Sequence, residues 1–90
     1  MSTINIDWEA VGYVKRSKNR IKALNNLKEP TMPSELAKEM KISLTHASKI
    51  CRELYSQGLI ECLNEKLKIG RLYRLTKKGE EILRVSINKF

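Results

Sequence analysis

The spacing of apolar residues changes at Gly58, and this change constrains the fold more than any other feature of the sequence. Before Gly58, apolar residues recur every three or four positions, the spacing that buries one face of a helix. After it, residues 59–63 and 71–75 follow the period of two that is typical of the strands of a hairpin. Gly70, in the connection 64–70, can adopt a positive φ near the end of the loop. We therefore expect helices first and a two-stranded hairpin after them.

Capping residues place the first helical segment. Asp7 is a suitable N-cap for a segment that reaches about Lys28. Glu29-Pro30 ends it, because the residue before a proline avoids the helical conformation. Ser17 lies in a polar, basic stretch of this segment and can cap a new helix there. The segment is therefore one helix, or two helices that meet at a bend.

Two more helices follow, joined by a tight turn. Pro33 suits the first position of a short helix that ends before a turn at Lys41-Ile42. Ser43 is a strong N-cap for the next helix, 43–57, and Gln57-Gly58 can end it with a left-handed residue. The buried face of this helix consists of Ala47, Ile50, Cys51 and Leu54. Two short helices around a tight turn, the second amphipathic, form the helix-turn-helix arrangement.

The length and the charge narrow the possible partners. Ninety residues form a single domain, residues 1–90, with a core that spans about 15–83. Eighteen Lys and Arg against ten Asp and Glu give a net charge of +8, which favours DNA, RNA or an acidic membrane surface as partner. The alternative is a lysine-rich globular protein whose charge serves no partner. Charge alone does not choose between them.

No segment predicts a membrane association. The N-terminal residues lack the basic and apolar regions of a signal peptide, and no apolar run is long enough to span a bilayer. We therefore expect a cytoplasmic protein without a membrane partner.

Cysteine and histidine content predicts no metal, no cofactor and no catalysis. Cys51 and Cys62 have no CxxC spacing, and we expect two reduced thiols. His46, the single histidine, lies five residues before Cys51, so the two side chains point to different helix faces. The sequence contains no glycine-rich phosphate loop, no nucleophile elbow and no paired carboxylates with an adjacent histidine. We therefore expect that the protein is not an enzyme.

The helix 43–57 is the candidate recognition helix. In a helix-turn-helix the second helix enters the major groove of DNA with its N-terminal residues against the base edges. Lys49 can reach guanine acceptors or a phosphate, and Arg52, one turn further, more readily reaches a phosphate. The candidate DNA contacts on this helix are Ser43, Thr45, His46, Ser48, Lys49 and Arg52. An exposed helix face is polar in most proteins, so this face alone does not establish DNA binding.

The hairpin region 64–74 is a second basic feature. Its candidate DNA contacts, on the DNA backbone or in the adjacent minor groove, are Lys66, Lys68, Arg71 and Arg74. The alternative is that these charges prevent edge-to-edge pairing of the hairpin with another sheet. Glu65 in the same loop weakens the DNA interpretation.

A third basic run either touches a phosphate or faces solvent: Lys15, Arg16, Lys18, Arg20 and Lys22. Because Arg16 and Arg20 are four residues apart, we expect them to share one helix face.

Several segments resemble winged helix regulators. Residues 33–38, 42–49 and 58–62 are similar to the helix-turn-helix part of these proteins, and 71–79 resembles the return strand of their wing and the start of their last helix. The sequence looks most like short archaeal-type winged helix proteins related to the MarR and ArsR regulators, over about residues 15–83. The resemblance implies a mostly α fold with a small β-hairpin, in the order helix-helix-turn-helix-hairpin-helix. It also implies a transcriptional regulator that binds double-stranded DNA sequence-specifically.

Two departures limit the resemblance. Related proteins often carry a larger apolar residue and an arginine where this chain has Ala47 and Lys49, so the preferred DNA sequence does not transfer. The cysteine-rich metal motif of the ArsR sensors is absent, and the small size leaves no room for the separate ligand pocket of larger regulators. The resemblance therefore implies no metal, no cofactor and no small-molecule effector.

Apolar residues near both ends of the chain predict a homodimer. Thr76 can cap a last helix that reaches about Asn88 and carries more apolar surface than one short helix needs. The predicted interface, unless these residues pack on the chain's own core, consists of Ile82, Leu83, Val85 and Ile87 together with Trp8 and Val11. A two-fold dimer would place two recognition helices about one DNA turn apart and predicts a palindromic site.

The main alternative function is a protein-interaction module of a transcription or replication assembly, because one fold can serve both roles. The outer face of helix 43–57 separates the two, since a basic, polar face favours DNA and an apolar face favours a protein. Here the face is basic and polar. RNA binding has less support, because Tyr13, Tyr55 and Tyr73 are scattered rather than gathered for base stacking.

Overall fold

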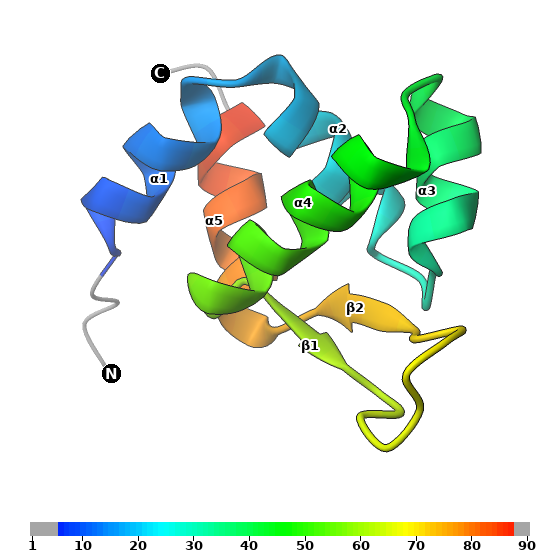
Figure 1. The fold of residues 1–90 in the computed structure, drawn as a ribbon. Helices are drawn as coiled ribbons and strands as arrows, with labels where there is room; N and C mark the ends of the chain where they lie inside the picture. The colour runs from blue at the N-terminus through cyan, green and yellow to red at the C-terminus, as the bar shows by residue number, and fades with distance from the viewer. Residues whose placement is uncertain (1–5, 88–90) are drawn as a thin grey trace.

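The protein, as a computed structural model that describes residues 6–87, consists of five helices and one antiparallel hairpin (Figure 1). The elements are α1 (Trp8–Lys15), α2 (Lys18–Asn26), α3 (Pro33–Met40), α4 (Leu44–Ser56), β1 (Ile60–Cys62), β2 (Tyr73–Leu75) and α5 (Lys77–Ile87). This order confirms the predicted fold of helices followed by a hairpin and a last helix. Asn88, the predicted end of that helix, lies outside the described residues.

The first helical segment is two helices, and local side chains separate them. The Asp7 carboxylate accepts a hydrogen bond from the Ala10 backbone N–H at 3.1 Å and caps α1. The Ser17 hydroxyl accepts one from the Arg20 backbone N–H at 3.4 Å and caps α2. Because an N-cap has an extended backbone, the chain bends at Ser17 instead of continuing one helix.

The break at Ser17 corrects the expectation for the basic run. Arg16 is the C-cap of α1, whereas Arg20 lies in α2, so the two do not share a helix face. Arg20 instead donates a hydrogen bond to the Tyr13 carbonyl oxygen at 2.6 Å, and its guanidinium lies 3.7 Å from the centre of the Tyr13 ring. Arg20 therefore holds the corner between α1 and α2.

The predicted turn between α3 and α4 is confirmed. Lys41, the C-cap of α3, has a left-handed backbone with φ 57°, which reverses the chain within three residues. The Ser43 hydroxyl then accepts a hydrogen bond from the His46 backbone N–H at 3.0 Å and caps α4. At the start of α3, Met32 has no capping side chain, and the Glu35 carboxylate accepts from the Met32 backbone N–H at 3.0 Å.

The hairpin pairs three residues with three, so each strand is shorter than the predicted five. Glu61 lies opposite Arg74, and the two flanking pairs join Ile60 to Leu75 and Cys62 to Tyr73. The Tyr73 backbone also exchanges two hydrogen bonds with Thr31, each 3.0 Å long, so the segment before α3 covers the outer edge of β2. The predicted left-handed glycines are confirmed, with φ 74° at Gly58 and 76° at Gly70.

The core lies where the helices meet the hairpin. The predicted buried face of α4 is confirmed, since Ala47, Ile50, Cys51 and Leu54 are each at most 5% exposed. Thr76 caps α5 as expected, accepting from the Gly79 backbone N–H at 3.0 Å and donating to the Gly58 carbonyl at 2.7 Å. None of the helices that the structure describes has the length and apolar character needed to cross a lipid bilayer.

The predicted dimer interface is wrong for most of its residues, because they are buried in the chain's own core. Val11, Ile82, Leu83 and Val85 are all less than 9% exposed, since α5 packs against α1, α2 and β2. Trp8 and Ile87 remain exposed, but they do not form one patch. Lys78 pairs with Asp7 at 3.1 Å, which places the start of α5 beside the start of α1 and Trp8. Ile87 lies at the other end of α5, roughly 14 Å away at the helical rise per residue.

Candidate nucleic-acid interface

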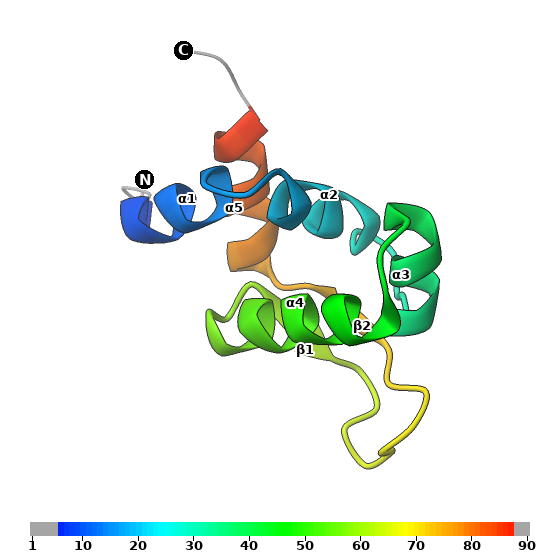
Figure 2. The same ribbon diagram turned by 45° about the horizontal axis from the view of Figure 1, so that its top comes forward.

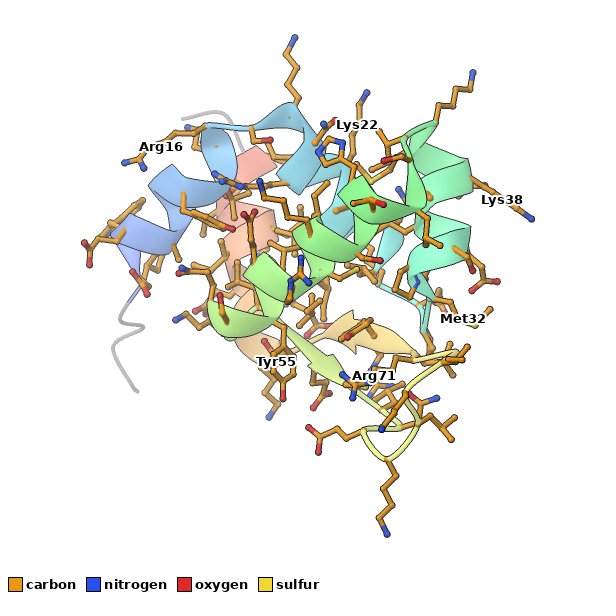
Figure 3. The ribbon with its side chains drawn as sticks, viewed as in Figure 1. Arg16, Lys22, Met32, Lys38, Tyr55 and Arg71 are labelled. Carbon is orange, nitrogen blue, oxygen red and sulfur yellow. The ribbon has the colours of Figure 1, made fainter. Side chains whose placement is uncertain are left out.

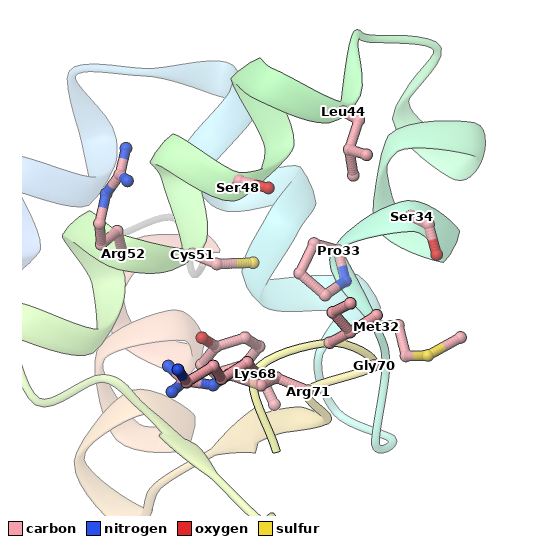
Figure 4. A pocket seen from close by; sticks show the side chains of 12 residues that line it. Met32, Pro33, Ser34, Leu44, Ser48, Cys51, Arg52, Lys68, Gly70 and Arg71 are labelled. Carbon is pink, nitrogen blue, oxygen red and sulfur yellow. The ribbon is translucent and has the colours of Figure 1, made fainter. Parts of the chain in front are cut away.

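A groove of about 470 Å³ separates α4 from the loop of the hairpin (Figure 4). We call this loop, residues 63–72, the wing loop. The start of α3 closes one end of the groove, and the wing loop projects beyond α4, away from α1 and α2 (Figure 2). Its lining includes four of the predicted DNA contacts: Ser48, Arg52, Lys68 and Arg71. The fold therefore brings the two basic features of the sequence onto one surface.

The outer face of α4 is polar and open to solvent. Exposed residues along it are Thr45, His46, Lys49 and Arg52, while Ser48 is partly buried at the edge of the groove. The Ser43 hydroxyl accepts the capping hydrogen bond from His46, so its own hydrogen can still be donated to an external acceptor. The start of this helix also presents unpaired backbone N–H groups, which favour an anion.

Asn64 holds the wing loop in one conformation. Its side-chain amide donates to the Gly70 carbonyl at 3.1 Å, and its side-chain oxygen accepts from the Leu72 backbone N–H at 2.8 Å. On the far side of the loop, the Nε of Arg71 donates to the Leu67 carbonyl at 2.7 Å. The interior of the loop is thus filled by polar groups of the loop itself. This role of Asn64 was not predicted, because its partners lie six and eight residues away.

Arg71 and Arg74, both predicted DNA contacts, lie on opposite faces of the hairpin. Arg71 of the wing loop and Tyr73 of β2 both line the groove. Arg74 follows Tyr73 in the strand, where successive side chains alternate between faces, so it points away from the groove. Arg74 lies 3.6 Å from the Glu61 carboxylate across the strands. The structure therefore groups Arg71 with α4 and leaves Arg74 outside the groove.

Tyr55 and Tyr73 form an aromatic pair beside the groove that sequence reasoning missed. Their ring centres are 6.4 Å apart in an edge-to-face arrangement, and the Tyr55 hydroxyl donates to Glu65 at 3.2 Å. The hydrogen bond to Glu65 raises the pKa of Tyr55, and the negative charge of that carboxylate adds to the effect. Glu65, which weakened the DNA interpretation of the loop, is thus occupied in joining the wing loop to α4. Figure 3 shows Tyr55 and Arg71 on this side of the molecule.

Exposed apolar residues also gather around the groove. Leu44 at the start of α4 is 55% exposed, and Ile69 in the wing loop is 89% exposed. Both line the groove together with Met32 and Pro33. The sequence signal for this apolar surface is the pair Leu67 and Ile69, which alternate with Lys66 and Lys68.

The two cysteines are free thiols, as predicted, with Cys51 buried and Cys62 partly buried. Among residues 6–87, no three side chains of the metal-binding types cluster closely enough to hold a metal ion. Burial raises the pKa of the Cys51 thiol from its ordinary value of 9.0 to about 11. The thiol is therefore protonated at neutral pH and is a poor nucleophile.

We expect the raised pKa of Cys51 to make the fold less stable in alkali. Between pH 9 and 11 the unfolded chain loses the thiol proton while the folded chain keeps it, so stability falls as the pH rises. The loss at pH 10 is about 1.4 kcal/mol. Urea unfolding at pH 8 and pH 10 should show a smaller alkaline loss in Cys51→Ala than in the wild type. Cys62→Ala serves as control and should keep the full loss; equal losses in all three proteins would contradict the assignment.

The helix-turn-helix, the hairpin and the helix after it define a winged helix domain, and solved structures share this fold. The multiple antibiotic-resistance repressor MarR from Listeria monocytogenes is 22% identical with a TM-score of 0.74, covering 92% of this chain and 62% of that one. A cysteine-to-serine mutant of Escherichia coli MarR in complex with operator DNA is 26% identical with a TM-score of 0.71, covering 87% and 58%. A homodimeric winged helix-turn-helix DNA-binding domain from Mycobacterium bovis, of a possible ArsR-family regulator, is 24% identical with a TM-score of 0.63, covering 96% and 83%.

Two of these similar structures are MarR proteins, and the third is described as a possible ArsR-family transcriptional regulator. The chain spans only 62% and 58% of the length of the two MarR proteins. The comparisons do not support the archaeal-type part of the resemblance. No protein-family model matches the sequence, and no curated protein matches it. The likeness establishes the fold, and the use of that fold rests on the residues of the groove.

Proposed function

We propose that this chain binds double-stranded DNA and regulates transcription, with α4 in the major groove and the wing loop on the adjacent backbone or minor groove. The observation that carries the proposal is the shared groove, in which Arg52 of α4 and Lys68 and Arg71 of the wing loop meet. Two elements far apart in sequence thereby present positive charge to one partner. The net charge of +8 and the operator complex of a similar structure add support.

The proposed contacts fall into two groups by the part of the DNA that they meet. Thr45, His46, Ser48 and Lys49 lie on the first turns of α4 and are proposed to meet base edges, with Ser48 partly buried at the edge of the groove. Contacts to phosphates are proposed for Ser43, Arg52, Lys66, Lys68 and Arg71. Arg74 has the least support, because it faces away from the groove and pairs with Glu61.

The proposed regulator acts as a homodimer that occupies promoter DNA without a cofactor. A similar structure is a homodimeric DNA-binding domain. With Val11, Ile82, Leu83 and Val85 buried, the remaining exposed apolar candidates for the interface are Trp8 and Ile87. Since these lie at opposite ends of the pair formed by α1 and α5, each would contribute to a separate part of the contact.

The test is the salt dependence of binding to a labelled random-sequence duplex, measured by fluorescence anisotropy. The wild type should bind with a log–log slope of several units, at about 0.9 per neutralised phosphate. We expect Lys49→Ala/Arg52→Ala to weaken binding at low salt by about tenfold or more and to reduce the slope by about 1 to 2. Sedimentation of the same samples gives the oligomeric state of the complex.

The matched control is Lys18→Ala/Lys22→Ala, which removes the same charge from exposed positions of α2. Lys22 lies on the opposite side of the molecule from Arg71 (Figure 3), so this pair should leave the slope nearly unchanged. A larger effect of the control than of the α4 pair would move the DNA surface away from α4. If the protein binds no duplex at low salt, the proposal of DNA binding is wrong. That result would favour a protein-interaction module, for which the exposed Leu44 and Ile69 would be the contact.

A further inference from the structure

In the wing loop, polar groups occupy the interior and apolar side chains lie on the outside. Asn64 fills the interior through its hydrogen bonds to Gly70 and Leu72. Outside, Leu67 is 50% exposed and Ile69 is 89% exposed. We call Leu67 and Ile69 the apolar tip. The loop gains nothing for its own folding from the Ile69 side chain, because almost none of that side chain is buried.

The apolar tip is held in place by the loop's own hydrogen bonds. The Leu67 carbonyl accepts from Arg71 at 2.7 Å, and the Leu67 N–H donates to the Asn64 carbonyl at 3.0 Å. Gly70 follows Ile69 with a φ of 76°, a conformation that costs a glycine little. The exposure of Ile69 is therefore part of an ordered loop and is available to a partner without a large ordering cost.

Exposed apolar residues are concentrated at this part of the molecule. Among residues 6–87, seven large hydrophobic side chains are exposed, and four of them lie in the wing loop or at the start of α4: Leu44, Leu63, Leu67 and Ile69. Single exposed apolar residues are normal, but such a concentration marks a contact surface. Lys66 and Lys68 alternate with the apolar tip, so the partner must offer negative charge on both sides of an apolar or stackable surface.

We infer that the apolar tip enters the minor groove of DNA and that Ile69 partly unstacks one base step there. The inference rests on the proposed function, because it requires α4 in the adjacent major groove. The minor groove is about 6 Å wide with a phosphate backbone on each side, which suits a narrow apolar tip whose two side chains alternate with Lys66 and Lys68. The expected target is a pyrimidine–purine base step, because such steps are flexible and need less free energy to unstack than other steps.

DNA fits this surface better than a membrane because of what surrounds the tip. Ile69 lines the same groove as Ser48 and Arg52 of α4, so a partner of the tip also meets hydroxyl and guanidinium groups. A bilayer would need a broad apolar face, whereas the tip consists of two side chains between charges. The wing loop projects beyond α4 (Figure 2), as a contact with the neighbouring groove of the same duplex requires.

The test measures base unstacking directly. Wild-type protein first enriches a duplex from a random pool, and 2-aminopurine, which fluoresces more when unstacked, then replaces one adenine at a time. We expect binding to raise the fluorescence about twofold or more at one step in the flank of the site. Ile69→Ala should abolish this rise and weaken binding by about 5–20-fold. Its salt slope should match that of the wild type, because no charge is lost.

Two further variants separate the apolar contact from the charges and from the fold. Lys66→Ala should reduce the salt slope by about 0.9 and keep the fluorescence rise. Ile69→Leu, which retains an apolar side chain, should keep most of the rise. No rise with the wild type, or an equal rise with Ile69→Ala, would overturn the inference and leave DNA binding standing. If the wild type binds no duplex, both proposals fail. Binding to phosphatidylglycerol vesicles that Ile69→Ala abolishes would then assign the tip to a membrane surface.

Discussion

Replacing Gly79 by alanine should lower the free energy of unfolding by about 2–4 kcal/mol, although alanine favours a helix more than glycine does. Gly79 is buried in the first turn of α5, against the residue that leads into β1. A Cβ on Gly79 would overlap the Leu59 carbonyl oxygen and lie 2.9 Å from the Leu59 carbonyl carbon. Such contacts are too short to form without movement of the backbone.

The Leu59 backbone has little freedom to move away. Its N–H donates to the Leu54 carbonyl at 3.0 Å, and its carbonyl accepts from the Thr76 N–H at 3.1 Å. Relief of the overlap would break one of these hydrogen bonds or shift α5 away from the core. The gain of about 1 kcal/mol from helix propensity is therefore smaller than the cost of the overlap.

Thermal unfolding of Gly79→Ala and Gly12→Ala provides the comparison. Gly12 lies in α1, and an added Cβ there would meet nothing within 4 Å, so Gly12→Ala should be neutral or slightly stabilising. Gly79→Ala should lower Tm by roughly 10–25 °C. Equal Tm values for the two variants would show that α5 does not pack against Leu59 as closely as described.

A second large effect is expected for Leu54→Ala, which should lower the free energy of unfolding by about 2–5 kcal/mol. Leu54 is fully buried near the end of α4. Its carbonyl accepts a hydrogen bond from the N–H of Leu59, the residue before β1. Truncation removes apolar contacts and leaves a cavity between α4 and the rest of the core. The side chains of α4 that are proposed to contact DNA lie on its outer face and are not part of this packing.

Leu44→Ala is the matched control, since it makes the same substitution in the same helix at a side chain that is 55% exposed. Urea unfolding should show a loss below about 1 kcal/mol for this variant. The Leu54→Ala variant, at a temperature where it is still folded, should bind DNA with an affinity within a few-fold of the wild type. The reason is that the side chains proposed to contact DNA are unchanged in this variant. A smaller loss for Leu54→Ala than for Leu44→Ala would contradict the packing of α4 described above.

The helix caps and the buried face of α4, which depend on neighbouring residues, were predicted correctly from the sequence. Ser17, Ser43 and Thr76 each cap a helix by accepting a hydrogen bond from a backbone N–H three residues ahead. Because donor and acceptor lie in the same short stretch of sequence, such caps can be predicted from it. The period of the apolar residues likewise predicted the buried face of α4. For the same reason the period of the apolar residues predicts that the outer face of α4, with Lys49 and Arg52, is exposed, as it is in the structure.

Features that depend on distant contacts were missed or wrong. Ile82 and Leu83 are buried because α1, α2 and β2 all pack against α5, and no local pattern reports how many neighbours a helix has. Arg74 lies outside the groove because the register of the hairpin pairs it with Glu61 and turns it away from α4. A shift of one residue in that register would have reversed the two faces.

The same division holds for the candidate site. Local sequence was enough to identify an amphipathic helix and a basic hairpin, because periodicity and charge are properties of adjacent residues. Only the tertiary structure shows that this helix and this hairpin line one groove. Only the tertiary structure shows, likewise, that Ile69 is exposed on the outside of the wing loop. The hydrogen bonds from Asn64 to residues six and eight positions away, and those from Thr31 to Tyr73, form only once the chain has closed on itself. Such contacts depend on loop closure and packing, and no short stretch of sequence carries that information.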